Sequence, residues 1–349
     1  MKTRILEVSE EHIDENIIRE AGRIIKEGGL VAFPTETVYG LGGNAFDPQS
    51  AKKIYAAKGR PSDNPLIVHI AESGDLYKVA AEVPEKAKKL SEELWPGPLT
   101  IILKKLPVVP KETTGGLDTV AVRLPSNRIA RALIRASGTF IAAPSANRSG
   151  RPSTTRASHV AEDLDGQVEM ILDGGGSAIG LESTIVDFTA EPPVILRPGY
   201  YNKKRIEEII GPVEADAGLE SDAAPKAPGM KYRHYAPKAE MTIVEGEGAA
   251  ERIRELVREK EEQGKKAAVL CSEEHKDLYR QGFVFPLGGA DNEEETARKL
   301  FDVLRKTDEL GADVIYSEAF NTPNLGTAIM NRLQKAAGHR IINTEEVQE

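Results

Sequence analysis

The chain has 349 residues, a length that suits two ordinary domains. Its 40% hydrophobic and 29% charged residues are typical of a globular protein and exclude a wholly disordered chain. No apolar run reaches the roughly 18 residues that a membrane span needs, and the single cysteine, Cys271, excludes a disulfide framework and a cysteine-rich zinc site.

The net charge of −9 is unevenly distributed along the chain. Residues 1–212 hold 27 of the 46 basic and 28 of the 55 acidic side chains, so most of the negative charge lies in the remainder. Within the near-neutral part, residues 123–156 contain seven arginines and no Asp or Glu. This local positive field suits phosphates, carboxylates or nucleic acid. Alternatively, Arg128, Arg131 and Arg135, which have helical spacing, form the solvated face of one helix.

Hydrophobic periodicity predicts a mixed α/β domain in residues 1–210. Apolar residues at helical spacing from Ile13 to Ile25 precede Gly28-Gly29, and Asp47-Pro48 is a capping pattern with proline at the first helical position. The last three predicted strands lie too close together for helical crossovers, so part of the sheet must be antiparallel. After the first helix we expect, in chain order, strand 30–33, helix 48–57, strand 66–70, helix 85–94, strands 99–103 and 119–124, helix 127–136, and strands 140–143, 168–172, 184–188 and 194–196.

Residues 211–239 are rich in Pro, Ala, Gly and charge without a sustained apolar period, which predicts a linker. A βα alternation then resumes and indicates a smaller, parallel, Rossmann-like domain in residues 240–349. The predicted fold class is therefore α/β, with a mixed parallel and antiparallel sheet in the first domain and a parallel sheet in the second. The elements expected in the second domain are strands 241–244, 267–271, 283–287 and 314–317 and helices 249–262, 293–310 and 327–337.

Several common catalytic motifs are absent from the sequence. It contains no G-x-x-x-x-G-K-[ST] phosphate loop, no G-x-G-x-x-G fingerprint, no H-E-x-x-H and no C-x-x-C. The glycines at 174–176 miss the dinucleotide spacing. If the protein binds phosphate, it does so with side-chain cations, hydroxyls and ordinary loop amides.

Three polar clusters have the composition of such a site. Residues 34–42 (PTETVYGLG) follow a buried strand, residues 58–64 (KGRPSDN) follow a helix, and residues 143–153 (APSANRSGRPS) combine small residues with donors. Each has a simpler alternative: a turn capped by threonines, a cation pair at a helix C-terminus, and a flexible polar loop. Residues 182–187 (ESTIVD) and Arg197 flank the last strands, and Arg197 alone would also fit a surface edge.

In this order, P-T-E-T-V-Y-G-L-G, K-G-R-P, A-P-S-A-N-x-S-G and S-T-I-V-D resemble the YrdC/Sua5 family of L-threonylcarbamoyladenylate synthases. The resemblance covers residues 15–210 as a YrdC-like catalytic domain. It continues through P-G-M-K-Y-R-H-Y-A-P into a Sua5-type C-terminal domain. Hydrogenase maturation proteins are another class with this domain, and they carry zinc modules built from several cysteines. The single cysteine of this sequence argues against that class.

The resemblance implies condensation of L-threonine, bicarbonate and ATP to threonylcarbamoyl-AMP, with release of pyrophosphate, for threonylcarbamoyl-adenosine (t6A) at position 37 of tRNA. In-line attack of a carbamate oxygen on the α-phosphate needs positioning and charge neutralisation rather than a strong nucleophile. The family pattern K-x-R…S-x-N supplies the catalytic set Lys58, Arg60, Ser145 and Asn147. Threonine is assigned to Thr37, His69, Arg123, the Ala143 backbone and Ser183. ATP is assigned to Lys58, Arg60, Asn64, Thr119, Ser145, Asn147, Ser153, Arg197, His234 and Tyr235.

The implied cofactor is Mg²⁺ held by the ATP phosphates, because the sequence offers no carboxylate cluster as a dedicated metal site. The implied partners are ATP, L-threonine, bicarbonate and a downstream threonylcarbamoyl transferase that acts on tRNA. The acidic start lacks the apolar core of a secretory signal, so we expect a cytoplasmic protein without a membrane partner. The alternative is an RNA-binding module that uses the arginines of 123–156, which would include weak contact with tRNA; net charge −9 and the lack of an RRM or KH signature oppose it.

The linker itself is expected to act at the site. Segment 228–237 (PGMKYRHYAP) is aromatic and basic, unlike a plain spacer. Tyr232, His234 and Tyr235 suit a nucleotide or its amino-acid partner, so we predict a lid at 211–239 that closes over the first domain and keeps water from the acyl-adenylate. Alternatively, these aromatics pin the linker to the second domain.

Overall fold

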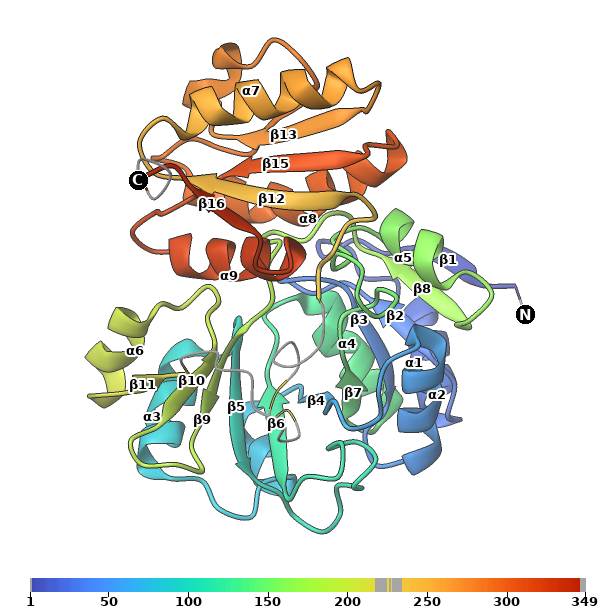
Figure 1. Cartoon of the computed structure of the whole chain (residues 1–349). Coiled ribbons are helices and arrows are strands. Elements are labelled where there is room, and N and C mark those ends of the chain that lie inside the picture. Colours follow the sequence, from blue (N-terminus) through green and yellow to red (C-terminus); the bar gives the residue numbers. More distant parts are fainter. Residues whose placement is uncertain (1, 217–224, 226, 228–233, 346–349) are drawn as a thin grey trace. The chain divides into compact units, whose positions relative to one another are not determined.

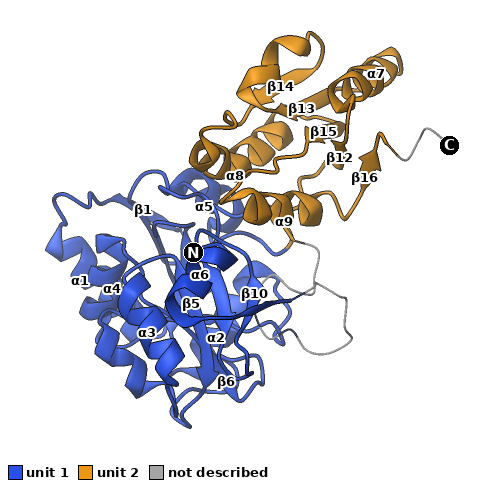
Figure 2. Ribbon diagram, turned by 90° about the vertical axis from the view of Figure 1, so that its left-hand side faces the viewer, with its two compact units in different colours: residues 1–149, 153–232 blue, residues 150–152, 233–349 orange. Residues whose placement is uncertain are grey.

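The computed structural model describes residues 2–216, 225, 227 and 234–345. Its contacts divide the chain into a first unit, residues 1–149 with 153–232, and a second unit, residues 150–152 with 233–349 (Figure 2). The division at residues 232 and 233 falls within the expected linker. Every helix in the described ranges is too short or too polar to cross a membrane.

The first unit is built on one mixed sheet in the order β1-β8-β2-β3-β7-β4-β6-β5-β9-β10-β11 (Figure 1). Pairs β2–β3, β3–β7, β4–β7, β5–β6 and β9–β10 are antiparallel, and the others are parallel. The antiparallel part that the short connections predicted is therefore present. The strands are β1 Arg4–Glu7, β2 Val31–Phe33, β3 Gly40–Asn44, β4 Ile67–His69, β5 Leu99–Lys104, β6 Thr119–Arg123, β7 Ile141–Ala143, β8 Met170–Asp173, β9 Thr184–Asp187, β10 Val194–Arg197 and β11 Glu214–Ala215.

Helices cover both faces of this sheet and bury a core on each. Apolar side chains of α1 and α4 pack with β2, β7 and β8 in one core, while those of α2, α3, α5 and α6 join the core on the other face. Two separate cores form because successive residues of a strand point to opposite faces of the sheet. The helices are α1 Glu15–Lys26, α2 Pro48–Lys58, α3 Glu85–Leu94, α4 Arg128–Ser137, α5 Ala157–Leu164 and α6 Lys203–Ile210, with a 3₁₀ turn at Ser73–Lys78.

Helix α2 shows how local sequence positions two future site residues. The Asp47 side chain accepts hydrogen bonds from the backbone N–H groups of Gln49 and Ser50, at 3.0 and 3.1 Å, and Pro48 follows the cap. Gly59, with φ of +62°, ends the helix in the left-handed conformation that glycine adopts without strain. The chain therefore turns between Lys58 and Arg60 and brings both cations to the same end of α2.

Some elements were not predicted, notably β3, whose sequence GLGGN lacks the branched residues typical of strands. Its glycines are required by close packing: a Cβ on Gly42 would lie 2.7 Å from Ile141 Cγ2 and 2.9 Å from Phe33 Cε1. Pairing with β2 and β7 keeps this segment extended, so the second half of 34–42 is a buried strand rather than a turn. Strands β1, β11 and β16 and helices α5 and α6 were also missed.

The second unit contains a parallel sheet in the order β14-β13-β15-β12-β16, as a Rossmann-like pattern predicts (Figure 1). Helix α7 packs on one face, with Ile253 and Val257 in its core, and α8 and α9 lie on the other (Figure 1). Cys271 is buried in the α7 core, and burial raises the pKa of its thiol. The elements are β12 Glu240–Glu245, α7 Ala249–Glu262, β13 Ala267–Cys271, a 3₁₀ turn Glu273–Leu278, β14 Phe283–Pro286, α8 Glu293–Glu309, β15 Val314–Glu318, α9 Gly326–Ala336 and β16 Ile341–Asn343.

Candidate active site

One face of β4, β5 and β6 brings together residues from three separate motifs. Paired residues of neighbouring strands point to the same face, and the register pairs His69 with Arg123 and Arg123 with Thr100. These three side chains therefore meet at the carboxyl end of β4 and β6. Thr119 begins β6 and lies at the opposite end of the same face. The two ends of β6 thus carry one residue assigned to threonine and one assigned to ATP.

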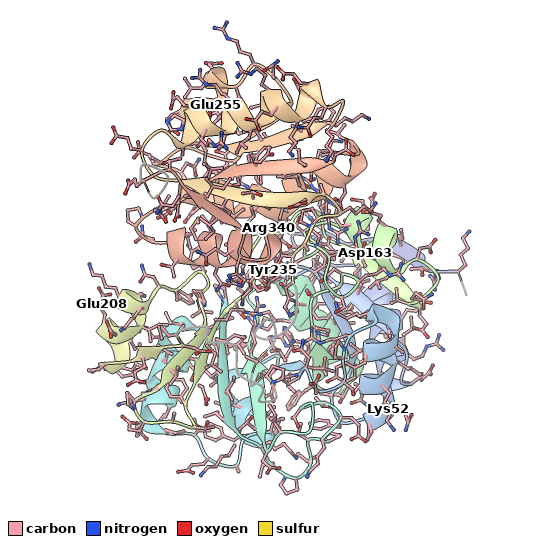
Figure 3. The ribbon with its side chains drawn as sticks, in the orientation of Figure 1. Lys52, Asp163, Glu208, Tyr235, Glu255 and Arg340 are labelled. Carbon is pink, nitrogen blue, oxygen red and sulfur yellow. The ribbon has the colours of Figure 1, made fainter. Side chains whose placement is uncertain are left out.

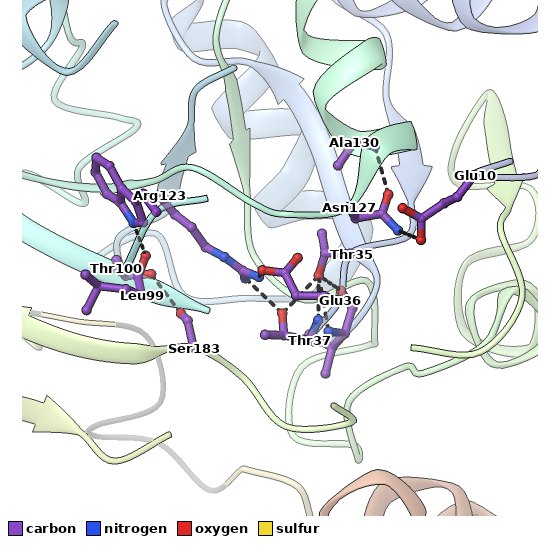
Figure 4. A network of polar contacts seen from close by, with 12 residues as sticks. Glu10, Thr35, Glu36, Thr37, Leu99, Thr100, Arg123, Asn127, Ala130 and Ser183 are labelled. Carbon is purple, nitrogen blue, oxygen red and sulfur yellow. Dashed lines mark hydrogen bonds and ion pairs between the residues drawn. The ribbon is translucent and has the colours of Figure 1, made fainter. Parts of the chain in front are cut away.

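Arg123 is the centre of a buried polar network (Figure 4). Its Nη1 donates to Thr37 Oγ1 at 2.8 Å, and the Thr37 hydroxyl lies 2.9 Å from that of Thr35. Thr35 in turn donates to the Val38 carbonyl at 2.6 Å. This chain of hydrogen bonds orients the P-T-E-T turn against the guanidinium, so two residues assigned to threonine lie in contact, and their binding of threonine stays a prediction.

Glu36 completes the network and was not predicted as a site residue. Its Oε1 lies 2.7 Å from Arg123 Nη2, and both side chains are buried (Figure 4). The sequence showed a carboxylate between two threonines after a buried strand, but nothing local indicated its cation. That partner is on β6 and comes close only through the sheet.

Ser183 joins this end of the sheet through β9, which pairs in parallel with β5. Its hydroxyl lies 2.7 Å from that of Thr100 (Figure 4). Arg197 donates to the Ser183 carbonyl and hydroxyl, at 3.0 and 3.1 Å. The structure therefore places Arg197, assigned to ATP, directly on a residue assigned to threonine. Thr100 was missed because a threonine inside an apolar strand carries no local signal.

His69 is buried beside Arg123 and stays neutral. Its Nδ1 lies 3.1 Å from the Ile67 carbonyl oxygen, and its ring is edge-on to Phe33 with centroids 6.0 Å apart. Burial, followed by the positive charge of Arg123, lowers the pKa of His69 to about 3. A neutral imidazole can accept or donate a hydrogen bond to an amino acid, but it adds no charge to the site.

Lys58 contacts the loop after β7, which carries the S-x-N part of the pattern, while Arg60 contacts the residues before β4. Lys58 Nζ donates to the backbone carbonyls of Ser145, at 2.5 Å, and of Asn147. The guanidinium of Arg60 donates to Asn64 Oδ1 and, at 3.1 Å, to the Pro65 carbonyl. Three of the predicted catalytic residues, Lys58, Ser145 and Asn147, are therefore joined in the first unit, while Arg60 contacts Asn64.

The A-P-S-A-N loop is ordered by its own side chains. Ser145 Oγ donates to Asn147 Oδ1 at 2.5 Å, and Asn147 Nδ2 donates to the Arg148 carbonyl at 2.8 Å. Ala143 ends β7 opposite Ile67 of β4. Ser153 is fully buried and donates to the carboxylate of Glu182, a second acidic residue that the sequence analysis left without a role.

The linker contributes to both units. Ala227, in the first unit, is completely buried against Ile67, Ile102, Ala121 and Ile185, on the face that carries the site. In the second unit Tyr235 (labelled in Figure 3) packs 5.1 Å from the Phe301 ring, with the Arg332 guanidinium 5.9 Å from its centre.

For Tyr235 the alternative, pinning to the second domain, is therefore observed. His234 lies beside it, with ring centroids 5.6 Å apart. Residues 217–224, 226 and 228–233 of the predicted lid lie outside the described residues, and ATP binding by His234 and Tyr235 stays a prediction.

The arginines of 123–156 do not form one open basic surface. Arg123 is buried on Glu36, and Arg151 Nη2 lies 3.8 Å from Asp308 within the second unit. Arg131 and Arg135 both pair with Glu72 on α4's solvent side, which confirms the alternative of a solvated helix face. This distribution weakens the case for an RNA-binding module.

No group of three or more His, Cys, Asp or Glu side chains in the described ranges is placed to hold a metal ion. The donors at Lys58, Arg60 and Ser145 suit phosphate oxygens. Mg²⁺ carried by the nucleotide's own phosphates stays a prediction.

Comparison with known proteins decides the family. Residues 23–199 match the family model Sua5_yciO_yrdC, described as telomere recombination, and residues 201–338 match Sua5_C, described as the C-terminal domain of threonylcarbamoyl-AMP synthase. The chain belongs to the Sua5/YrdC family, with the Sua5 C-terminal domain. The chain is thus an enzyme, a threonylcarbamoyl-AMP synthase, and formation of this AMP adduct is a nucleotidyl transfer in t6A synthesis on tRNA.

Curated relatives match over nearly the whole chain. A threonylcarbamoyl-AMP synthase of Pyrococcus abyssi is 53% identical over 95% of this chain and 97% of its own length. One of Bacillus subtilis is 50% identical over 93% and 94%. The crystal structure of P. abyssi Sua5 complexed with L-threonine has a TM-score of 0.93 and 51% identity, covering 98% of this chain and all of that one.

Proposed function

We propose that the chain condenses L-threonine, bicarbonate and ATP to threonylcarbamoyl-AMP, pyrophosphate and water at the site on β4, β6 and the loop after β7. The observation that carries this proposal is the junction of Lys58 with the Ser145–Asn147 loop, on the same sheet as the Arg123–Thr37 network. One unit thereby combines cations that can bind a polyphosphate with the Arg123 guanidinium, which can bind a carboxylate through two parallel hydrogen bonds.

Each half of the site has a distinct task in this reaction. Arg123 binds the threonine carboxylate, with Thr37, His69, Ser183 and the Ala143 backbone around the remainder of the amino acid. A carbamate formed from the threonine amine and bicarbonate then presents its oxygen to the α-phosphate. No described residue has to act as a nucleophile. The acceleration of the reaction therefore comes from the alignment of the carbamate with the α-phosphate and from stabilisation of the charge that develops on the phosphate oxygens.

The second half holds the nucleotide. Lys58, Arg60, Asn64, Thr119, Ser145, Asn147, Ser153 and Arg197 bind ATP, and Arg60 faces the bicarbonate or the departing pyrophosphate. Mg²⁺, bound to the phosphate oxygens, supplies further neutralisation of their charge.

The product has to pass to a transferase that modifies tRNA, because an acyl-adenylate hydrolyses in water. We place this exchange in the cytoplasm, where ATP and tRNA are available. The alternative of a dedicated RNA-binding module gains no support from the paired arginines on α4.

A pyrophosphate-release assay with ATP, Mg²⁺, bicarbonate and L-threonine tests the proposal. Release is expected to require all of them, and mass spectrometry should detect threonylcarbamoyl-AMP. Pyrophosphate release that is unchanged without threonine or bicarbonate would contradict it. Steeply salt-dependent tRNA binding without ATP turnover would favour the RNA-binding alternative instead.

A further inference from the structure

The ion pair between Glu36 and Arg123 lies where water hardly reaches. The Arg123 side chain is 5% exposed and that of Glu36 10%, and Arg123 Nη2 lies 2.7 Å from Glu36 Oε1. Removing either charge from such a pair leaves the other buried without compensation. Glu36 therefore balances the charge of Arg123, but balance alone does not require the arrangement that these two groups adopt.

The pair leaves most of its hydrogen-bonding capacity unused. Only Nη1 of Arg123 makes a hydrogen bond, to Thr37, while Nε and Nη2 find no acceptor of suitable geometry in the described residues. Both carboxylate oxygens of Glu36 likewise receive no hydrogen bond from the described part of the chain. Buried donors and acceptors in this state favour a ligand that supplies the complementary groups.

A zwitterionic amino acid supplies both complements on adjacent atoms. Its carboxylate accepts hydrogen bonds from a guanidinium, and its ammonium group donates to a carboxylate. We propose that Glu36 binds the amino group of L-threonine, so that Glu36 and Arg123 together recognise an α-amino acid rather than any carboxylic acid. This inference rests on the proposed function, because it concerns the amino-acid half of the same site.

Charge balance supports this assignment over a competing one. The Glu36–Arg123 pair is neutral overall and so is the threonine zwitterion, so binding adds no uncompensated charge to the buried site. In the competing interpretation, the threonine carboxylate takes the place of the Glu36 carboxylate on Arg123, so binding of threonine has to displace the Glu36 side chain. The displaced Glu36 would then need another cation, and Arg123 is the cation that the structure pairs with it.

A comparison of two ligands separates these interpretations. Calorimetry without ATP measures binding of L-threonine and of its 2-hydroxy analogue, in which a hydroxyl replaces the amine. The unmodified protein should prefer L-threonine by about 30-fold or more, since a charge-assisted contact in a desolvated site is lost with the analogue. Glu36→Gln should reduce this preference to a few-fold and bind the anionic analogue at least as well as before.

Two controls keep the result interpretable. Glu72→Gln removes a carboxylate that pairs with arginines on α4, outside the site, and should leave the preference unchanged. If Glu36→Gln fails to fold, the unmodified protein still decides, because equal affinity for the two ligands would overturn the inference. Tighter threonine binding by Glu36→Gln would also overturn it. Loss of pyrophosphate release in the unmodified protein would refute the proposed function, whereas the ligand preference is measured without turnover.

Discussion

Two groups of buried cations in the first unit are held by different kinds of oxygen. Lys58 and Arg60 donate to backbone carbonyls and to the Asn64 side-chain amide, which carry no formal charge. Arg123 instead faces the carboxylate of Glu36. Contacts with carbonyl and amide oxygens orient a cation toward a ligand. The contact of Arg123 with the Glu36 carboxylate also contributes to the folding stability of the protein without a ligand, because each group compensates the buried charge of the other.

This difference matches the ligands that the two halves are proposed to bind. ATP brings several negative charges, which the cations Lys58 and Arg60 can bind. Threonine brings one charge of each sign, and the Glu36–Arg123 pair presents both. Substitutions in the two halves should therefore act on different quantities, namely turnover for the cations near ATP and folding stability for Arg123.

The largest effect is expected from breaking the ion pair. Arg123→Met should lower the free energy of unfolding by about 3–5 kcal/mol, because it leaves the Glu36 carboxylate buried without its cation. It should also weaken threonine binding. Urea unfolding measures the first and calorimetry the second.

The double variant Arg123→Met with Glu36→Gln is the matched control for stability. It should recover most of the loss, since no uncompensated charge remains. Purely additive losses from the two single changes would show that the two charges are not coupled.

The next effect concerns the half that faces ATP. Arg60→Ala should reduce turnover by at least about 100-fold, corresponding to roughly 3 kcal/mol of lost stabilisation of developing phosphate charge. Its folding stability should change less than that of Arg123→Met. Steady-state pyrophosphate release gives the rate, and unfolding gives the stability.

Lys52→Ala provides the control, since Lys52 is an exposed lysine on α2 (labelled in Figure 3). Its turnover should match the unmodified protein. An Arg60 variant that keeps full turnover would remove Arg60 from the catalytic set.

The smallest effect at neutral pH comes from His69, which burial, followed by the charge of Arg123, keeps neutral. Its pKa is lowered from 6.5 to about 3, so between these values the unfolded chain binds a proton that the folded one does not. Stability should be full above pH 6.5 and fall as pH decreases toward 3, by at most about 1.4 kcal/mol per pH unit from this residue. Unfolding measured at several pH values tests this.

His69→Asn should flatten the slope, while the same change at the exposed His12 should leave it intact. An identical slope in both variants would show that His69 is not the titrating group. Threonine affinity at pH 6–8 should not follow the protonation of an imidazole.

Local sequence was sufficient for the parts of the site that depend on neighbouring residues. Asp47, Pro48 and Gly59 define α2 through capping and a left-handed turn, and so they place Lys58 and Arg60. The alternation of β6 places Thr119 and Arg123 on one face. The ordered motifs indicated the family before any contact was known.

Only the tertiary structure decided which distant groups meet. The pairing of Glu36 with Arg123, of Thr100 with Ser183, and of Arg197 with Ser183 joins strands or turns that no local pattern relates. Sheet register selects these partners, since shifting a strand by one residue would turn each of them to the other face. The same reason explains β3: its glycines favour no strand by themselves, and the close approach of β2 and β7 keeps the segment extended.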